Sequence, residues 1–391
     1  MVHIFLKYFV YLQMNENKNE FLLEGGITYL NHGSFGACPR VVFEDYQNWQ
    51  IRLEKQPVQF LTEELYSSLK KSRESLSLLL GCDQDEVLFF QNPTTAISNI
   101  IYNLDLNPGD EVLMTDHEYG ALVRAWNAWG NKAKVHIKYA NVTLPLKSKN
   151  RFFEDISSKI SSKTKVLFLS HITSPTGLVF PIKDIIEFAK KRKIITIVDG
   201  AHVPGHIDLH IHNLGCDFYT GALHKWMCSP IGVSFLFVKK EHQKWIKPVI
   251  YSWGKDGDDP EDSEFLQDFQ WQGTRDMSAF LTIPKVMNFF KINIESFQDR
   301  SKKLILNSME QFHKVLGTYP ISKGDDFLGQ MISFPLPKSI DGNLKDLLWQ
   351  NHNIEIPIFE WNKEKFIRLS IHVYNDQKDI DSLMNALRSI I

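Results

Sequence analysis

Strand-like and helix-like segments alternate through the middle of the chain, and this alternation constrains the fold more than any other feature of the sequence. Short apolar runs rich in β-branched residues lie at 86–90, 110–115, 165–170 and 194–198. Apolar residues at helical spacing occupy 182–191, between the last two runs. Strands that alternate with helices form a mostly parallel sheet with helices on both faces. The sequence therefore predicts an α/β fold whose ligands bind beyond the carboxyl ends of the strands.

The pattern changes in the last quarter of the chain. A long helical stretch at 293–316 precedes a strand, a helix, two strands and a final helix, at 330–335, 344–351, 354–359, 366–373 and 376–390. This order predicts a second, smaller α+β domain, which we expect an N-terminal segment to join. The predicted division of the chain is an N-terminal extension at 1–24, a segment of the small domain at 25–64, a large domain at 65–285 and the C-terminal small domain at 286–391.

The charge balance excludes a protein that binds nucleic acid through a basic surface. Lysine and arginine total 44, aspartate and glutamate total 46, and the formal net charge is −2. Four cysteines lie far apart without a Cys-x-x-Cys pair, at positions 38, 82, 216 and 228. They suit neither a disulfide framework nor a zinc site, so we expect a reducing, cytoplasmic environment.

The first fourteen residues are apolar and aromatic, and a polar run at 15–20 follows them. They are too short to span a bilayer, which needs about 20 apolar residues. Lys7 interrupts the apolar stretch, and no small-residue cleavage site follows it, so a secretory signal is not expected. We interpret 1–14 as an extension and no membrane association is expected; one hypothesis is that Met14 is the native start.

Four histidines have nearly the spacing of a helical metal-binding face, at positions 202, 206, 210 and 212. Pro204 and Gly205 interrupt any helix there, and no series of carboxylates accompanies the histidines. The sequence therefore predicts no metal site.

An acid and a lysine stand out as candidates for chemistry. Asp199 ends a predicted strand, where a polar side chain meets ligands at the edge of the sheet. Lys225 lies between His224 and Trp226. Covalent amine chemistry needs a lysine of lowered pKa, and an aspartate suits the protonated ring nitrogen of pyridoxal phosphate. On spacing alone, Asp199 as a helix cap and Lys225 as a surface residue fit equally well.

A longer string that includes both residues, at 198–226, resembles the lysine loop of the class V aminotransferase family of fold-type I pyridoxal-phosphate enzymes. Further motifs of the family follow its order along the chain, as YLNHGSFGACPR (29–40), TDHEYGA (115–121), SPTGLV (174–179), WQGTRD (271–276) and IRLSIHVYN (367–375). Within the family, the isopenicillin N epimerase-like branch is most similar. The resemblance implies a mostly parallel seven-stranded sheet with helices on both faces and a smaller α+β domain.

The resemblance also implies roles for individual residues. Lys225 would form the Schiff base with pyridoxal 5′-phosphate and move the Cα proton of the substrate. Asp199 would pair with the pyridinium nitrogen, and His202 would bond the phenolic oxygen. Arg368 would clamp the substrate α-carboxylate, a bidentate task for which arginine is suited.

The phosphate is expected at the start of the helix that Pro93 opens, where Thr94 and Thr95 offer backbone N–H groups. His224 is expected as a further phosphate donor. In a homodimer with the active site at the interface, Thr274 would reach the phosphate of the neighbouring subunit.

Two positions of the pocket stay open in this interpretation. Either His117 or Tyr119 would lie against the ring of the cofactor. Asn31 and His32 would line the substrate side of the pocket.

The reaction type is not determined by these residues, because racemisation, transamination and β-elimination start from the same Cα carbanion. An epimerase-like reaction on an amino acid or amino-acid-derived substrate is the first hypothesis. A cysteine-conjugate or sulfoxide C–S lyase and an aminotransferase are the alternatives, and a non-catalytic binding protein is a further one. A cysteine desulfurase is not expected, because such enzymes carry a thiolate on a loop shortly before the carboxylate-binding arginine, and 354–368 contains no cysteine. Epimerisation needs a second acid, for which the candidates are His32, His117, Tyr119 and His372.

Overall fold

The computed structural model describes residues 18–257, 263–293, 297–322, 325–340 and 343–391. The predicted extension at 1–14 and the hypothesis about Met14 lie outside the described residues.

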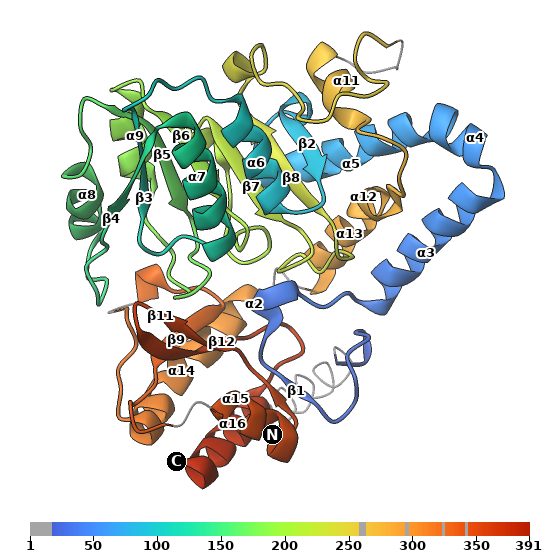
Figure 1. Cartoon of the computed structure of the whole chain (residues 1–391). Helices are drawn as coiled ribbons and strands as arrows, with labels where there is room; N and C mark the ends of the chain where they lie inside the picture. Colours follow the sequence, from blue (N-terminus) through green and yellow to red (C-terminus); the bar gives the residue numbers. More distant parts are fainter. Residues whose placement is uncertain (1–17, 258–262, 294–296, 323–324, 341–342) are drawn as a thin grey trace.

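A seven-stranded sheet forms the centre of the larger part of the molecule (Figure 1). Its strands, in spatial order, are β2 (Val87–Phe90), β8 (Ser234–Val238), β7 (Phe218–Ala222), β6 (Ile195–Asp199), β5 (Thr164–Ser170), β3 (Glu111–Thr115) and β4 (His136–Ala140). Strand β8 runs antiparallel to both of its neighbours, and the other strand pairs are parallel. The predicted mostly parallel seven-stranded sheet is therefore confirmed.

Apolar side chains project from both faces of this sheet, and β5 is an example. Val166 and Phe168 join one buried cluster, and Leu167 and Leu169 join the other. The first face is covered by α6 (Pro93–Asn103), α7 (Gly120–Ala133) and α11 (Glu264–Gln270), and the second by α5 (Leu65–Leu80), α8 (Lys149–Ser157) and α9 (Lys183–Lys190). Successive residues of a strand point to opposite faces, so a strand buried on both sides is continuously apolar.

The C-terminal part forms a smaller layer below the large sheet in Figure 1. Its antiparallel sheet has the order β11 (Ile358–Trp361), β12 (Glu364–Ser370) and β9 (Met331–Pro335), and its helices are α14 (Gln298–Leu316), α15 (Leu344–His352) and α16 (Gln377–Ile390). A separate pair joins β1 (Thr28–Tyr29) to β10 (Ile354–Glu355) in parallel. The stretch predicted as one strand at 354–359 is thus divided between two sheets.

The N-terminal segment is shared between the two parts. Strand β1 and the short helix α2 (His32–Phe35) lie with the C-terminal part, whereas α3 (Arg40–Lys55) packs on α12 (Ser278–Leu281) and α13 (Ile283–Asn293). The predicted domain boundaries stay a prediction.

The remaining helical turns are short: α4 (Pro57–Gln59), a π-helical turn at Phe60–Glu64, α10 (Ile211–Leu214), and 3-10 turns at Gln84–Glu86, Lys240–His242 and Asp325–Phe327. Among the described residues, the helices are too short or too polar for any of them to cross a membrane.

Candidate active site

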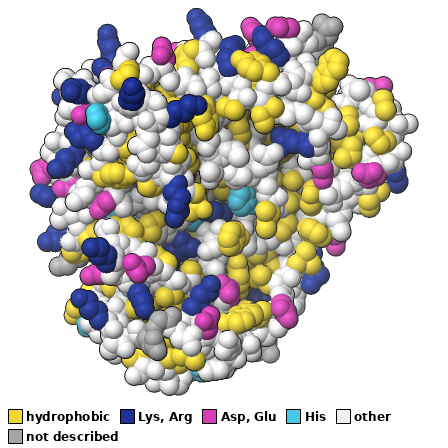
Figure 2. Space-filling view, viewed as in Figure 1, with side chains coloured by type: hydrophobic (Ala, Val, Ile, Leu, Met, Phe, Trp, Pro, Cys, Tyr) yellow, Lys and Arg dark blue, Asp and Glu magenta, His cyan; other side chains and the backbone are white. Residues whose placement is uncertain are grey.

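A cavity of about 730 Å³ opens at the carboxyl ends of the parallel strands, where α2, the starts of α6 and α7, and strand β11 surround it. Figure 2 shows a hollow in the middle of this face, with basic and histidine side chains inside it. Ser170 and Asp199, the last residues of β5 and β6, belong to its wall. The site therefore lies where the sequence predicts ligand binding.

Lys225 follows β7 and lines the cavity. Its Nζ atom is 3.1 Å from Nε2 of His202, and the indole Nε1–H of Trp226 donates to Nδ1 of the same ring over 3.3 Å. Burial lowers the pKa of Lys225 to about 8; Asp199 opposes this shift and Arg368 adds to it. Burial also lowers the pKa of His202 well below 6.5, so its imidazole is neutral. At pH 7 about a tenth of Lys225 is then neutral amine, far more than for an ordinary lysine.

Asp199 is buried at the mouth of the sheet, with Oδ1 accepting the backbone N–H of Ala201 at 2.9 Å. Burial raises its pKa, and the Ala201 N–H and Lys225 oppose that rise. Glu118 is a second buried carboxyl group of the cavity wall, which the sequence analysis missed. It lies 2.6 Å from the Thr115 hydroxyl, and burial raises its pKa to about 7.

Arg368 extends from β12 into the same cavity and is buried. Its Nη1 donates to the carbonyl of Ser174, and its Nη2 donates to the Ser34 hydroxyl over 2.9 Å. Nε of the guanidinium has no hydrogen-bond partner among the described residues. Burial lowers the pKa of Arg368 to about 10. This value is still well above 7, so the guanidinium is cationic at neutral pH. A buried cation with an unused donor suits a carboxylate ligand.

The start of α6 lies at one side of the cavity. Asn92 caps the helix by accepting the backbone N–H of Thr95 at 2.9 Å, and Pro93 and Thr94 line the cavity. The hydroxyl of Thr95 donates to the Asn92 carbonyl, and Thr95 is not among the lining residues. Both the backbone N–H and the hydroxyl of Thr95 therefore serve the cap, whereas the sequence led us to expect that this N–H faces the phosphate.

His224 also lines the cavity, and its Nδ1–H donates to the carbonyl of Val233 at 2.9 Å. Burial lowers its pKa to about 4. The neutral ring has its proton on Nδ1, so Nε2 carries a lone pair until an anion raises the pKa of the ring.

The structure distinguishes the two residues that the sequence left open for the ring of the cofactor. Tyr119, at the start of α7, lines the cavity and is 45% exposed. His117 is fully buried, accepts or donates a 2.8 Å bond with the Thr176 hydroxyl, and packs against Trp361. The geometry therefore favours Tyr119 and does not place His117 in the cavity.

Asn31 and His32 do not line the cavity, contrary to expectation. Asn31 donates to Glu355 Oε1 at 2.8 Å. His32 is fully buried behind the lysine loop, with Nδ1 2.7 Å from the Tyr374 hydroxyl and Nε2 3.0 Å from the Lys225 carbonyl oxygen. The resemblance implied that these two residues line the substrate side of the pocket, whereas the structure places His32 behind the lysine loop and Asn31 against Glu355.

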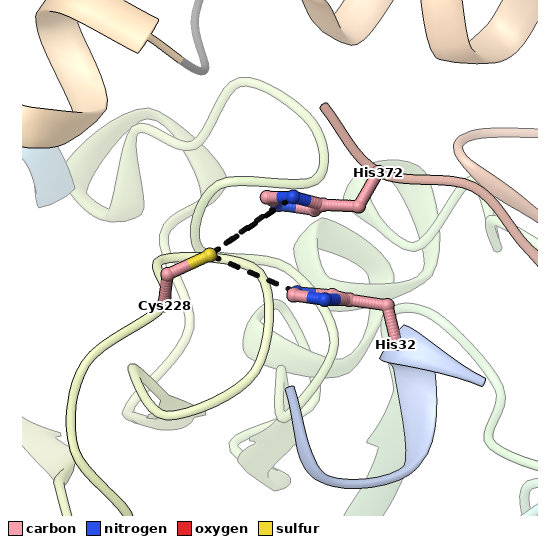
Figure 3. A group of neighbouring side chains, drawn as sticks. All are labelled: His32, Cys228 and His372. Carbon is pink, nitrogen blue, oxygen red and sulfur yellow. Dashed lines mark hydrogen bonds between the residues drawn. The ribbon is translucent and has the colours of Figure 1, made fainter. Parts of the chain in front are cut away.

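His372 lies against His32 and performs a similar task (Figure 3). The two rings stack with centroids 3.8 Å apart, and Nε2 of His372 is 3.3 Å from the Trp226 carbonyl oxygen. The Cys228 thiol lies 3.6 Å from the same nitrogen. Tyr374 and the Lys225 carbonyl occupy both ring nitrogens of His32, and the Trp226 carbonyl occupies Nε2 of His372, so these side chains form a hydrogen-bonded support of the lysine loop.

Thr274 is exposed and is not among the residues that line this cavity. The wall contains further residues that the sequence analysis missed, from α2 and from the β11 strand: Phe35, Phe359, Glu360 and Trp361. Their contribution depends on how the small sheet is placed over the large one, and no local signal in the sequence indicates it.

Comparisons with known proteins agree with this geometry. The sequence pattern described as "Aminotransferase class-V" matches residues 29–383. An isopenicillin N epimerase from Amycolatopsis lactamdurans is 30% identical over 94% of this chain and 96% of its own. A probable L-cysteine desulfhydrase from Arabidopsis thaliana is 26% identical over 97% of this chain and 86% of its own. The solved cysteine desulfurase from Thermococcus onnurineus NA1 has a TM-score of 0.80, with 17% identity and coverage of 93% and 94%.

The last of these similarities concerns the fold alone, whereas the sequence matches extend over nearly the whole chain. The α/β architecture is that of fold-type I enzymes, and the cofactor is pyridoxal 5′-phosphate. This protein belongs to the class V aminotransferase family of pyridoxal-phosphate enzymes.

Proposed function

We propose that this pyridoxal-phosphate enzyme acts at the Cα atom of an amino acid or amino-acid-derived substrate, with isopenicillin N epimerase-like chemistry. One observation carries the proposal: Lys225, whose pKa is lowered to about 8, shares a cavity with the carboxyl group of Asp199 and the guanidinium of Arg368. The residues present fit the cofactor, because they offer an amine for its aldehyde, an acid for its ring nitrogen and a helix start for its phosphate.

The catalytic assignments follow from this placement. The bound cofactor supplies an electron sink for the Cα carbanion. Lys225 Nζ takes the Cα proton and holds it on one face of the substrate. Asp199 would hold the proton of the ring nitrogen, and His202 would donate to the phenolic oxygen. Each of these three residues lines the cavity.

Arg368 binds the α-carboxylate of the substrate. Two observations support this role: burial of the guanidinium, and an Nε–H group without a partner among the described residues. A carboxylate that accepts from this donor fixes the Cα atom relative to Lys225, because an arginine–carboxylate pair has a defined plane.

The phosphate would lie at the start of α6, where the helix dipole and the backbone of Thr94 favour an anion; the N–H of Thr95 in the same turn already bonds to the Asn92 cap. His224 joins them once the phosphate raises its pKa and protonates Nε2. Tyr119, which lines the cavity, would lie against the ring of the cofactor.

The assembly we propose is a homodimer in which Thr274 completes the phosphate site of the partner. Support comes from a groove of about 980 Å³ whose apolar lining includes Val58, Leu61, Trp253 and Trp271, the last of which precedes Thr274 by three positions in the chain. Trp253 is 82% exposed, an unusual state for so large an apolar side chain. A cytoplasmic location is part of the proposal, and the four free cysteines support it.

The second acid of an epimerase is Tyr119 in this proposal. Of the four candidates from the sequence, only Tyr119 lines the cavity; His32, His117 and His372 are fully buried elsewhere. A phenol delivers a proton from the face opposite to Lys225 if the two side chains flank the Cα atom.

A C–S lyase is the second candidate, because the same Cα carbanion expels a sulfur leaving group and an L-cysteine desulfhydrase matches nearly the whole chain. A cysteine desulfurase is excluded in the proposal. Cys228 is buried behind the lysine loop, burial raises the pKa of its thiol well above 9, and no cysteine lines the cavity among the described residues. An aminotransferase remains the third candidate.

Two measurements test the proposal. The purified protein incubated with pyridoxal phosphate is expected to absorb visible light, and borohydride is expected to bleach the band; a colourless wild type would favour a non-catalytic binding protein. L-Amino acids in deuterated water then separate the reactions by NMR. Deuteration at Cα with inversion supports the epimerase, pyruvate with ammonia supports the lyase, and a keto acid without ammonia supports the aminotransferase.

A further inference from the structure

The indole of Trp226 and the amine of Lys225 lie on opposite edges of the His202 ring. The indole Nε1–H donates to Nδ1 over 3.3 Å, and Nε2 is 3.1 Å from Lys225 Nζ. An indole nitrogen donates and has no lone pair with which to accept. Nδ1 of His202 is therefore the acceptor, and a neutral imidazole then has its proton on Nε2.

We propose that Trp226 is a positioning residue for the cofactor chemistry: its N–H locks His202 in the Nε2–H tautomer, so the ring presents a donor to Lys225 and to the phenolic oxygen of the bound cofactor. The second half of this statement rests on the proposed function. The first half concerns the side chains of this chain alone.

The tautomer has a consequence for the charge of Lys225. Both hydrogen bonds then have the same direction: Trp226 Nε1–H donates to His202 Nδ1, and His202 Nε2–H donates to Lys225 Nζ. An Nε2–H group bonds to Nζ only when the amine has a lone pair, whereas an ammonium would set two donors against each other. Trp226 therefore favours the neutral amine, the form that attacks a carbonyl carbon.

Other charged and titratable groups act on the same pair. Asp199 favours the ammonium form of Lys225, and Arg368 favours the amine. Arg368, His206 and His224 all favour neutral His202. None of them bonds to Nδ1 of His202 among the described hydrogen bonds, so the choice of tautomer falls to Trp226.

Trp226 could instead matter only because its ring fills space, and the experiments must separate that role from the hydrogen bond. Its ring centroid is 4.0 Å from that of His206 and 5.2 Å from that of His32, so the side chain also fills space. A Trp226→Phe variant keeps an aromatic ring and removes the N–H. Trp126 offers a matched control, because it is equally buried and its Nε1 has no partner among the described residues.

The first experiment is ¹⁵N NMR of the apo-enzyme with labelled histidine, with a His202→Gln variant to assign the resonances. We expect His202 of the wild type to be protonated on Nε2 and unprotonated on Nδ1. In W226F we expect a mixture of tautomers, and in W126F the wild-type spectrum. A proton on Nδ1 in the wild type, or an unchanged tautomer in folded W226F, would overturn the proposal. Should W226F not fold, the wild-type spectrum still decides.

The second experiment follows the visible absorbance of the loaded enzyme against pH. A hydrogen-bond donor at the phenolic oxygen of the cofactor withdraws electrons from it. This lowers the pKa of the Lys225 nitrogen that is bound to the cofactor. In W226F we expect the midpoint of the absorbance titration to rise by about half a pH unit or more, because that shift corresponds to the free energy of one lost hydrogen bond. W126F should keep the wild-type midpoint, and an equal shift in both variants would overturn the role. If the wild type binds no cofactor, the proposed function fails, while the NMR spectrum still tests the tautomer.

Discussion

Buried basic side chains lie on both sides of the lysine loop, but those on the cavity side have polar atoms left for a ligand. On the cavity side, Lys225 and Arg368 have polar atoms available for a ligand. On the rear side, Nε2 of His32 is hydrogen-bonded to the carbonyl oxygen of Lys225, and Nε2 of His372 to that of Trp226. Burial alone therefore does not separate a catalytic group from a structural one; the difference is whether the protein already satisfies the hydrogen-bonding capacity of the group.

Lys225→Ala provides the strongest test of the cavity side. Removal of the amine eliminates both the covalent link to the cofactor and the proposed base. We expect kcat/KM to fall by about 10²- to 10⁴-fold or more, because general-base catalysis alone contributes that much. Steady-state kinetics and the borohydride-sensitive absorbance check it. The variant should melt no lower than the wild type, because it relieves the burial of an amine; wild-type activity would contradict the assignment.

Arg368→Gln tests the substrate end of the cavity. The glutamine lacks the planar fork that binds a carboxylate, so KM is expected to rise by about 10- to 100-fold, with a smaller loss in kcat. The visible band of the cofactor should persist, since Arg368 does not hold the cofactor in the proposal. Arg368→Lys serves as the control that keeps the charge. A KM equal to that of the wild type in both variants would remove Arg368 from the substrate site.

The pH dependence of cofactor capture tests the state of Lys225. The neutral amine reacts, and the fraction of neutral amine grows as pH rises toward the pKa of about 8. The rate at which the apo-enzyme captures pyridoxal phosphate should therefore rise about tenfold per pH unit below pH 7 and level off above pH 9. Stopped-flow absorbance measures it. A rate that still climbs steeply between pH 9 and pH 10 would show an ordinary lysine.

Tyr374→Phe tests the rear side and should have the smallest catalytic effect. The hydroxyl of Tyr374 lies 2.7 Å from Nδ1 of buried His32. Its loss leaves that nitrogen unsatisfied and should lower the free energy of unfolding by about 1–3 kcal/mol. Denaturant unfolding measures this, while kcat per folded enzyme should change only a few-fold. A large kcat loss with unchanged stability would place Tyr374 among the catalytic groups.

Periodicity in the sequence predicted β2, β3, β5 and β6 of the large sheet, as short apolar runs, whereas β4, β7 and β8 were not predicted from it and the count of seven strands came from the family resemblance. It failed at 354–359, where Ile354 pairs with Thr28 and Ile358 pairs with Ile367. Partner choice by a short strand depends on distant segments, which local patterns do not contain.

The candidate site was predicted less evenly. The position of Asp199 follows from a predicted strand end and that of Lys225 from the lysine-loop motif, and the structure brings both to one cavity. The side of the loop on which His32 lies, the choice between His117 and Tyr119, and the buried carboxyl of Glu118 depend on three-dimensional packing. The hydrogen bond from Trp226 to His202 likewise joins two loops that are distant in sequence.

The support behind the lysine loop also determines when an active site can exist during synthesis. His32 contacts Tyr374, and the two residues are separated by 342 positions. A nascent chain that has completed the seven-stranded sheet lacks His372 and Tyr374, so His32 has no Tyr374 hydroxyl to orient it and the Trp226 carbonyl has no His372 behind it. Contacts between the two ends of a chain form late. The enzyme therefore acquires its finished lysine loop only when almost the entire polypeptide has left the ribosome.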